Sequence, residues 1–364
     1  MDTQRLEIAH LFHRTGFGPK PGEFSAALSA GVTSTRSKVL TAPSRTSFVT
    51  PPVLTDLGPR PAANSPAVVE FSQQLRYQIQ LLFLWWLDEM VASPHTLQEK
   101  MTWFWHGHWA TSIGKVNYAL PMFNQNVTMR KYALGNFSDF AKAMFSDGAL
   151  QVWLDGQENT VKAPNENLSR EMMELFVLGV NRYTEKDVKE LARSFTGYQV
   201  SRTTGTVTYN ARRRDTAPVT VLGKTAAMSP EEVIGHLVSQ NNSALFIAER
   251  VWFRFVSSQE PLPQDHPMIK AFADRDIYAL MKSLVESPAL SQEQYSMVKS
   301  PVEWFIGLCR ALAITPSKLP SPTKLYGYFE KLSQVPFSPP NVGGWPTDQA
   351  WLSSASAQFR VAFA

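Results

Sequence analysis

The stretch that decides the fold runs from Ala163 to Val200 and reads APNENLSREMMELFVLGVNRYTEKDVKELARSFTGYQV. Its first half carries an apolar stripe at helical spacing, formed by Leu168, Met172, Leu175 and Phe176. Gly179 follows this pattern, at a position where glycine commonly ends a helix. Thr184 and Asp187 then match a capping box, which predicts a second helix that ends before Gly197. The stretch therefore predicts two helices joined by a short turn.

Two carboxylates and an amide lie beside this apolar stripe. Glu171 and Glu174 share a helical face with Asn167, and Glu171 borders the buried side. A carboxylate at the edge of a core is unusual unless it is paired or binds a ligand. One interpretation is a structural ion-pair network with Arg170 and Arg193, which this helix taken alone favours. The other is a catalytic site that uses the two carboxylates together with Arg170 and Asn167.

A histidine pair ends another helical pattern. Residues 103–109 read WFWHGHW and place His106 and His108 at the end of a predicted buried helix. If the backbone stays helical, the two imidazoles lie about 200° apart and cannot share a ligand. If Gly107 unwinds the chain, both rings point the same way, which is a chelating geometry for zinc, copper or iron. The alternative, which the motif alone slightly favours, is a pair of core histidines hydrogen-bonded to the backbone.

Composition limits the class of protein. The 364 residues are 44% hydrophobic and 18% charged, enough for a sizeable core, and ten Trp predict an aromatic-rich interior or pocket. The net charge of +4 is too small to argue for nucleic acid. Cys309 is the only cysteine, which excludes an internal disulfide and a multi-cysteine zinc site.

The apolar runs are short. The longest, Leu81 to Leu87, falls far below the ~20 residues that span a bilayer. The first residues also lack the apolar segment of a signal peptide. We therefore expect a cytoplasmic protein without a membrane span.

The remaining patterns predict a single mainly α-helical domain that covers residues 1–364. Residues 36–65 are rich in Pro, Ser and Thr and predict an irregular surface segment. Thr96 and Glu99 match a capping box, and Tyr198 to Tyr209 alternates as a small β-hairpin does. The chain shows neither alternating strand and helix patterns nor a glycine-rich nucleotide motif, which argues against a Rossmann fold and a nucleotide cofactor.

Candidate substrate contacts lie outside the central stretch. The tail, residues 336–352, reads PFSPPNVGGWPTDQAWL and is loop-like, and its Trp345 predicts that the loop packs back on the body as a lid. Trp105 and Trp345 are candidate substrate-binding residues. Arg214 ends a run of three arginines that is typical of a solvated face, or that alternatively holds an anionic substrate group. Asp155 either caps a turn or joins the carboxylates of the central stretch.

Five segments together resemble one known family. They read HLFHRTGFGP, LQEKMTWFWHGHWATS, PNENLSREMMELFVLGVNRYTEKDVKELARSFTGY, KSPVEWFIGLCRAL and PPNVGGWPTDQAWL. In this order, and over nearly the whole chain, they are similar to the large bacterial family known as domain of unknown function 1800. The resemblance implies no particular activity. Many relatives carry export signals and sit beside a sulfatase-like or phosphatase-like family, which implies a protein partner.

The resemblance also points to particular positions. The matching motif residues are His106, His108, Asn165, Glu166, Asn167, Arg170, Glu171 and Glu174. Where relatives often have His-Asp followed by a lysine, this chain has Arg214, Asp215 and Val219. Any role of that histidine or lysine is therefore lost or changed here.

Three functions of different classes follow. The first is a metal-dependent enzyme of the hydrolase type that acts on a small molecule or peptide; its zinc, iron, manganese or magnesium ion is held by His106, His108, Glu171 and Asp155. The second is a lyase or cyclase for a hydrophobic, isoprenoid-like substrate in an aromatic-walled cavity. The third is a non-catalytic binding or scaffold protein, in which alanine at His106 or Glu171 only lowers stability.

Overall fold

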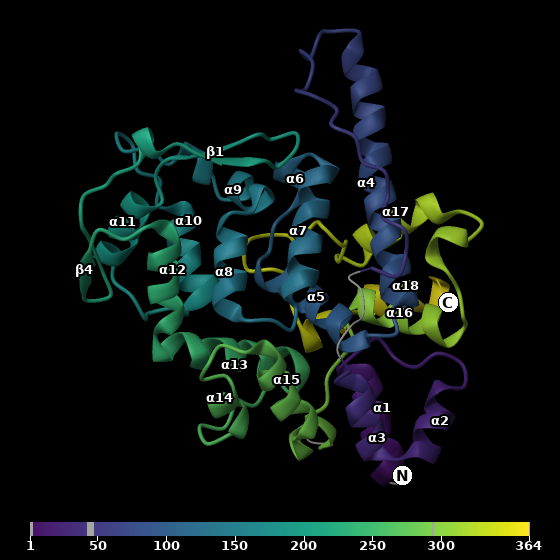
Figure 1. The fold of residues 1–364 in the computed structure, drawn as a ribbon. Coiled ribbons are helices and arrows are strands. Elements are labelled where there is room, and N and C mark those ends of the chain that lie inside the picture. The colour runs from purple at the N-terminus through teal and green to yellow at the C-terminus, as the bar shows by residue number, and fades with distance from the viewer. Residues whose placement is uncertain (1–2, 42–46, 293–294, 364) are drawn as a thin grey trace.

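The computed structural model describes residues 3–41, 47–292 and 295–363 (Figure 1). Helices joined by short turns dominate these residues, together with two small antiparallel hairpins, so the predicted mainly α fold is confirmed. Three helices come first and lie at one end of the molecule: α1 Thr3–Arg14, α2 Glu23–Ala30 and α3 Val32–Val39.

The prediction that residues 36–65 form an irregular segment is wrong for the first residues, because α3 continues to Val39. Residues 42–46 of this prediction lie outside the described residues. Residues 47–65 contain no helix or strand. They run beside the long helix α4, Ala67–Ala92, whose first half extends beyond the body in Figure 1.

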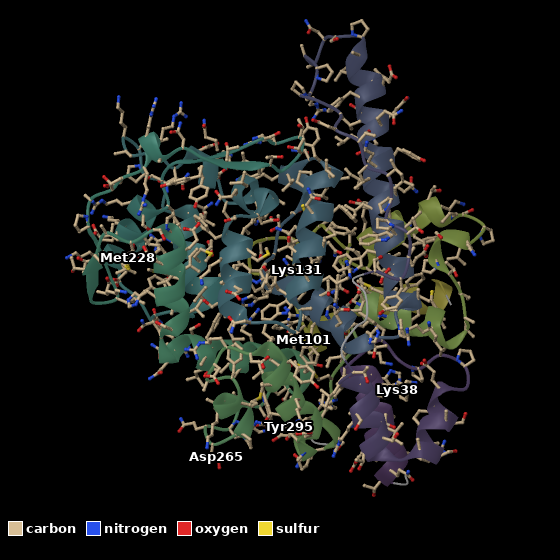
Figure 2. All side chains as sticks on the ribbon, viewed as in Figure 1. Lys38, Met101, Lys131, Met228, Asp265 and Tyr295 are labelled. Carbon is tan, nitrogen blue, oxygen red and sulfur yellow. The ribbon has the colours of Figure 1, made fainter. Side chains whose placement is uncertain are left out.

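The body is arranged around helix α5, Thr96–His108, in which every residue except the first and Gly107 is buried. A helix that is apolar nearly all round must pack against several neighbours to bury its surface. The helices that follow α5 in the chain are α6 Ile113–Val116, α7 Ala119–Tyr132, α8 Phe137–Phe145 and α9 Gly148–Trp153. Figure 2 shows that side chains fill the spaces between these ribbons.

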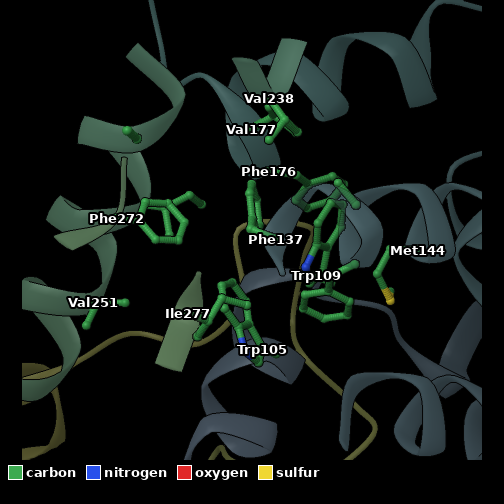
Figure 3. Packing of buried hydrophobic residues seen from close by; sticks show 14 of the residues in the cluster. Trp105, Trp109, Phe137, Met144, Phe176, Val177, Val238, Val251, Phe272 and Ile277 are labelled. Atoms are coloured by element: carbon green, nitrogen blue, oxygen red, sulfur yellow. The ribbon is translucent and has the colours of Figure 1, made fainter. Parts of the chain in front are cut away.

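Two large hydrophobic clusters meet at α5. The first contains Trp105 and Trp109 with Phe137 and Phe176, which lie together in Figure 3. The second contains Trp103 and Trp86, the latter from α4. Successive residues of α5 thus point into different clusters, as a helical backbone requires.

The central stretch forms helices, but not as predicted throughout. Its first part is α-helical only over α10, Asn167–Glu171, and continues as the π-helix η2, Met172–Val177. The second helix, α11 Glu185–Ser194, begins with the predicted capping box between Thr184 and Asp187. A short 3-10 helix, η1 Gly156–Glu158, precedes the stretch.

The predicted hairpin is confirmed. Strand β1, Tyr198–Val200, pairs antiparallel with β2, Val207–Tyr209, with Tyr198 opposite Tyr209. The sequence did not predict the second hairpin, in which β3 Val219–Val221 pairs with β4 Lys224–Ala226. The 3-10 helix η3, Ala211–Arg213, lies between the two hairpins along the chain.

The last third of the chain is helical up to the tail. Its α-helices are α12 Pro230–Ser239, α13 Asn241–Phe255, α14 Pro267–Ala271, α15 Ile277–Glu286, α16 Pro301–Ala311, α17 Leu325–Lys331 and α18 Ser354–Phe363. Its 3-10 helices are η4 Pro288–Ser291, η5 Pro316–Lys318, η6 Pro322–Lys324 and η7 Asp348–Trp351. Among the described residues, no helix combines the length and the hydropathy that crossing a bilayer requires.

Candidate functional site

The two predicted histidine ligands lie on an unbroken helix. Helix α5 passes through Gly107 without unwinding, so the extended chelating geometry does not form. The Nε2 atom of His106 accepts a hydrogen bond from the backbone N–H of Phe337 at 2.9 Å. The same ring packs against Trp86 and Trp345, at 5.0 and 5.3 Å between ring centroids.

His108 points to the other hydrophobic cluster. Its Nε2 lies 2.9 Å from the carbonyl oxygen of Phe176 and donates to it. The pKa of each imidazole is lowered to about 3, by burial for His106 and by burial together with the charge of Arg250 for His108. Both rings are therefore neutral at physiological pH, and each serves as a hydrogen-bonded core side chain.

The predicted carboxylates also have separate surroundings. Glu174 accepts a hydrogen bond from the hydroxyl of Tyr183. Glu171 is half-buried, and burial followed by the negative charge of Glu174 raises its pKa. Asp155 instead forms an ion pair with Lys115 at 2.7 Å.

Ion pairs do occur around the central stretch, but none of those described below involves Glu171 or Glu174. Arg170 pairs with Glu185 at 2.7 Å and with Glu166 at 3.2 Å. Arg193 pairs with Glu190 and with Asp215. The amide of Asn167 donates to the carbonyl of Leu154 at 3.2 Å, which joins α10 to the end of α9.

These positions do not converge on one point. Across residues 3–41, 47–292 and 295–363, no group of three or more His, Cys, Asp or Glu side chains is placed to hold a metal ion. The shared site expected for His106, His108, Glu171 and Asp155 is therefore not formed by these side chains. The physical reason is that α5 directs its two histidines into different clusters, while Asp155 is already matched by Lys115.

The three predicted substrate contacts also separate. Trp105 is fully buried and donates from Nε1 to the carbonyl of Ala133, so no substrate reaches it. Arg214 donates to the carbonyl of Met228, which Figure 2 labels near one edge of the molecule. Arg214 lines an open pocket beside Tyr198 and Tyr209. Trp345 lines a different cavity, where its ring stacks on Trp103 at 5.1 Å between centroids.

This cavity, which we call the motif cavity, has two adjoining parts that share Lys100, Arg254 and Glu303. The inner part has a volume of about 50 Å³ and lies between α5, α13, α16 and the tail. The outer part has a volume of about 260 Å³, is partly open to solvent, and is bordered by α1 and residues 296–299. Sites for drug-sized ligands are typically larger, at about 300–1,000 Å³, so this cavity suits only a small ligand.

The tail forms one wall of the inner part. Gly344 lies so close to α5 that a Cβ at this position would stand 2.3 Å from the carbonyl oxygen of Gly107. Asp348 fixes the next turn, because it accepts hydrogen bonds from the N–H of Val298 and the hydroxyl of Ser258, both at 2.7 Å. The expected packing of the tail against the body is thus observed.

Charged side chains of the motif cavity come from four separate parts of the chain. Lys100 of α5 forms an ion pair with Glu303 of α16. Lys299 lies at the mouth, where its Nζ is 3.0 Å from Nδ1 of His13. Arg254 of α13 donates to the carbonyl of Trp345 at 2.9 Å.

The cavity shifts the pKa values of these groups. Burial, then Lys299 and Lys100, lowers the pKa of His13 to about 4. Burial also lowers the pKa of Arg254 to about 10, and burial followed by Lys100 lowers that of Lys299. Burial alone would raise the pKa of Glu303, but Lys100 and the hydrogen bonds from Ser300 together lower it. The positive charges in the cavity thus disfavour one another, whereas the ionised form of Glu303 is stabilised.

Sequence reasoning missed these residues because each is ordinary by itself. A lysine or an arginine on a helix is most often a solvated side chain. One signal was available: the cavity is lined from four of the five segments that carry the family resemblance, namely HLFHRTGFGP, LQEKMTWFWHGHWATS, KSPVEWFIGLCRAL and PPNVGGWPTDQAWL. The fifth, central segment contributes no residue to its lining.

Comparison with known proteins identifies a family for this chain. The family model described as "Protein of unknown function (DUF1800)" matches residues 10–364, and the chain belongs to this family. A search of curated proteins and a search of solved structures each found no significant match.

Proposed function

We propose that this protein binds a small anionic molecule in the motif cavity. The observation that carries the proposal is an excess of positive charge: Arg14, Lys100, Arg254 and Lys299 line the cavity, against the carboxylates of Glu303 and Asp348. Lys100 neutralises Glu303, and Asp348 is held by hydrogen bonds from the chain. An anion would compensate the charge that remains.

Arg254 and Lys299 are the cations with most to gain from such a ligand. Neither forms an ion pair with a carboxylate among the described residues. A cation that is partly removed from water is costly unless a counter-charge is close. The planar guanidinium of Arg254 suits a carboxylate, phosphate or sulfate group, since it donates two parallel hydrogen bonds. Arg14 is less available, because it already donates to the carbonyls of Phe255 and Val256.

Calorimetric titration with phosphate, sulfate and small carboxylates tests the proposal. We expect at least one of these anions to bind, and Arg254→Gln and Lys299→Gln each to weaken its binding. Loss of one charge-assisted contact costs about 1.5–3 kcal/mol, which corresponds to about ten-fold or more in affinity. Arg213→Gln removes an exposed arginine far from the cavity lining and should leave affinity unchanged. Absence of binding, or equal binding by the Arg254 and Arg213 variants, would contradict the proposal.

The functions predicted from the sequence differ in the residues that they require. A metal-dependent hydrolase requires an ion on His106, His108 or Glu171, and a lyase or cyclase requires a wide apolar chamber. The scaffold requires only that these residues hold the fold, and the backbone contacts of His106 and His108 support that part of it. None of the three requires Arg254 or Lys299, so the variants above separate them from anion binding.

A further inference from the structure

The two lysines of the motif cavity have different partners. Lys100 is buried and its Nζ is matched by the carboxylate of Glu303. Lys299 is exposed at the mouth, and its Nζ contacts the neutral ring of His13 at Nδ1. The amine of Lys100 is already occupied by a carboxylate. Lys299 is therefore the lysine whose amine is both reachable and free of a fixed counter-charge.

We infer that Lys299 forms an imine with the carbonyl carbon of a small oxo acid, whose carboxylate is held by Arg254. This inference rests on the proposed anion binding and names the substrate class for the same cavity. Lys299 and Arg254 both line the outer part, so both groups face the same cavity. Amines that form imines are characteristically lysines made less basic by burial or by another cation nearby.

The charged and titratable neighbours of Lys299 favour its neutral form. Burial and the charge of Lys100 lower its pKa, while Glu303 on α16 acts in the opposite direction. On α1, His13 and His10 also line the outer part, and Arg254 on α13 adds a further positive charge there. Water at the mouth weakens each of these effects relative to a fully enclosed lysine.

The chemical step balances without a redox partner. The lone pair of Nζ attacks the carbonyl carbon, and a C–N bond forms as the C=O bond opens to a carbinolamine. The carbonyl oxygen leaves as water with the two hydrogens of the amine, and a C=N bond remains. His13 lies against Nζ and is neutral, so it accepts the first proton and returns it to the departing oxygen.

Reductive trapping tests the inference on the full-length protein. Pyruvate or glyoxylate is added with cyanoborohydride, and the modified peptide is identified by mass spectrometry. We expect the reduced adduct on Lys299, its loss in Lys299→Arg, and slower adduct formation in His13→Gln. Arg254→Gln should reduce trapping with the oxo acid more than trapping with acetaldehyde, which has no carboxylate.

The matched control is Lys282→Arg, which replaces an exposed lysine on α15 and should not change the adduct. Equal labelling of Lys282 and Lys299, or an adduct on neither, would overturn the inference. Calorimetry with the same oxo acid tells the two proposals apart. If the oxo acid binds but no adduct forms, only the imine proposal is contradicted. If no anion binds at all, the proposed function is contradicted as well.

Discussion

At the scale of single residues, the histidines show how one motif serves the fold. His106 is 1% exposed, and its Nε2 accepts the N–H of Phe337, which lies 231 positions later in the chain. A protonated ring would lose this acceptor and would carry an unmatched charge among tryptophans. The motif WFWHGHW therefore joins the tail to α5 through a neutral imidazole.

This contact predicts how stability depends on pH. The pKa of His106 is about 3 in the folded chain, below the usual histidine value of about 6.5 in the unfolded chain. Between these two values the unfolded chain binds more protons, so the free energy of unfolding falls as the pH falls. We expect His106→Gln, which can still accept the Phe337 N–H, to make chemical-denaturation stability less dependent on pH between about 6.5 and about 3.

His95→Gln is the control for this measurement, because it changes a histidine at the start of the same helix that is not buried in either cluster. An unchanged pH profile in His106→Gln would show that the ring is accessible to protons in the folded chain.

At the scale of elements, the tail is held against α5 by close backbone packing. Gly344 has φ 83° and lies against the carbonyl of Gly107. We expect Gly344→Ala to cost about 2–5 kcal/mol, since the left-handed backbone adds about 1–2 kcal/mol and the steric contact adds about 1–3 kcal/mol. Urea unfolding followed by tryptophan fluorescence measures this cost.

Gly223→Ala is a matched control for the steric part. Gly223 has a similar φ of 78°, but an added Cβ would meet no atom within 4 Å. It should therefore cost only about 1–2 kcal/mol, from the left-handed backbone alone. Equal losses in the two variants would mean that the tail moves away from α5 without penalty.

Local signals in the sequence predicted some elements well and others poorly. The capping box at Thr184 is formed, because both of its hydrogen bonds lie within four residues. The one predicted at Thr96 is not formed, because the carboxylate of Glu99 turns inward to Trp86 and Arg130. Glu99 thus bonds to side chains distant in the sequence and not to the nearby helix cap. The residues around Thr96 give no sign of this, because the partners lie elsewhere in the chain.

At the scale of the whole molecule, too, local sequence patterns predicted some features, whereas features that depend on long-range contacts were not predicted. Helical periodicity sufficed to predict a mainly α chain, since it reports burial along each element. The motif cavity depends on contacts such as His13 with Lys299 and Lys100 with Glu303, which are 286 and 203 positions apart. No spacing in the sequence links such positions, so the sequence did not predict this cavity.

Metal content is the remaining prediction at this scale. An ion on Nε2 of His106 or His108 would have to displace a backbone contact of 2.9 Å in a buried position, and Asp155 would have to leave Lys115. We therefore expect the purified protein to contain less than stoichiometric zinc, iron or manganese, and its thermal midpoint to be unchanged by EDTA. A metal held at about 100 times its dissociation constant would contribute about 2.7 kcal/mol of stability, enough to move the midpoint measurably.

Metal binding by this chain stays a prediction of the sequence until that measurement is made. One equivalent of metal per chain, lost together with stability on EDTA treatment, would require the histidine surroundings to differ from those described. Repeating the melt with His106→Gln then identifies the ligand, because a bound ion on this ring makes the EDTA effect disappear in the variant. With or without EDTA, the same concentration of anion should raise the midpoint of the wild type more than that of Arg254→Gln. The two melts together therefore assign any ligand either to α5 or to the motif cavity.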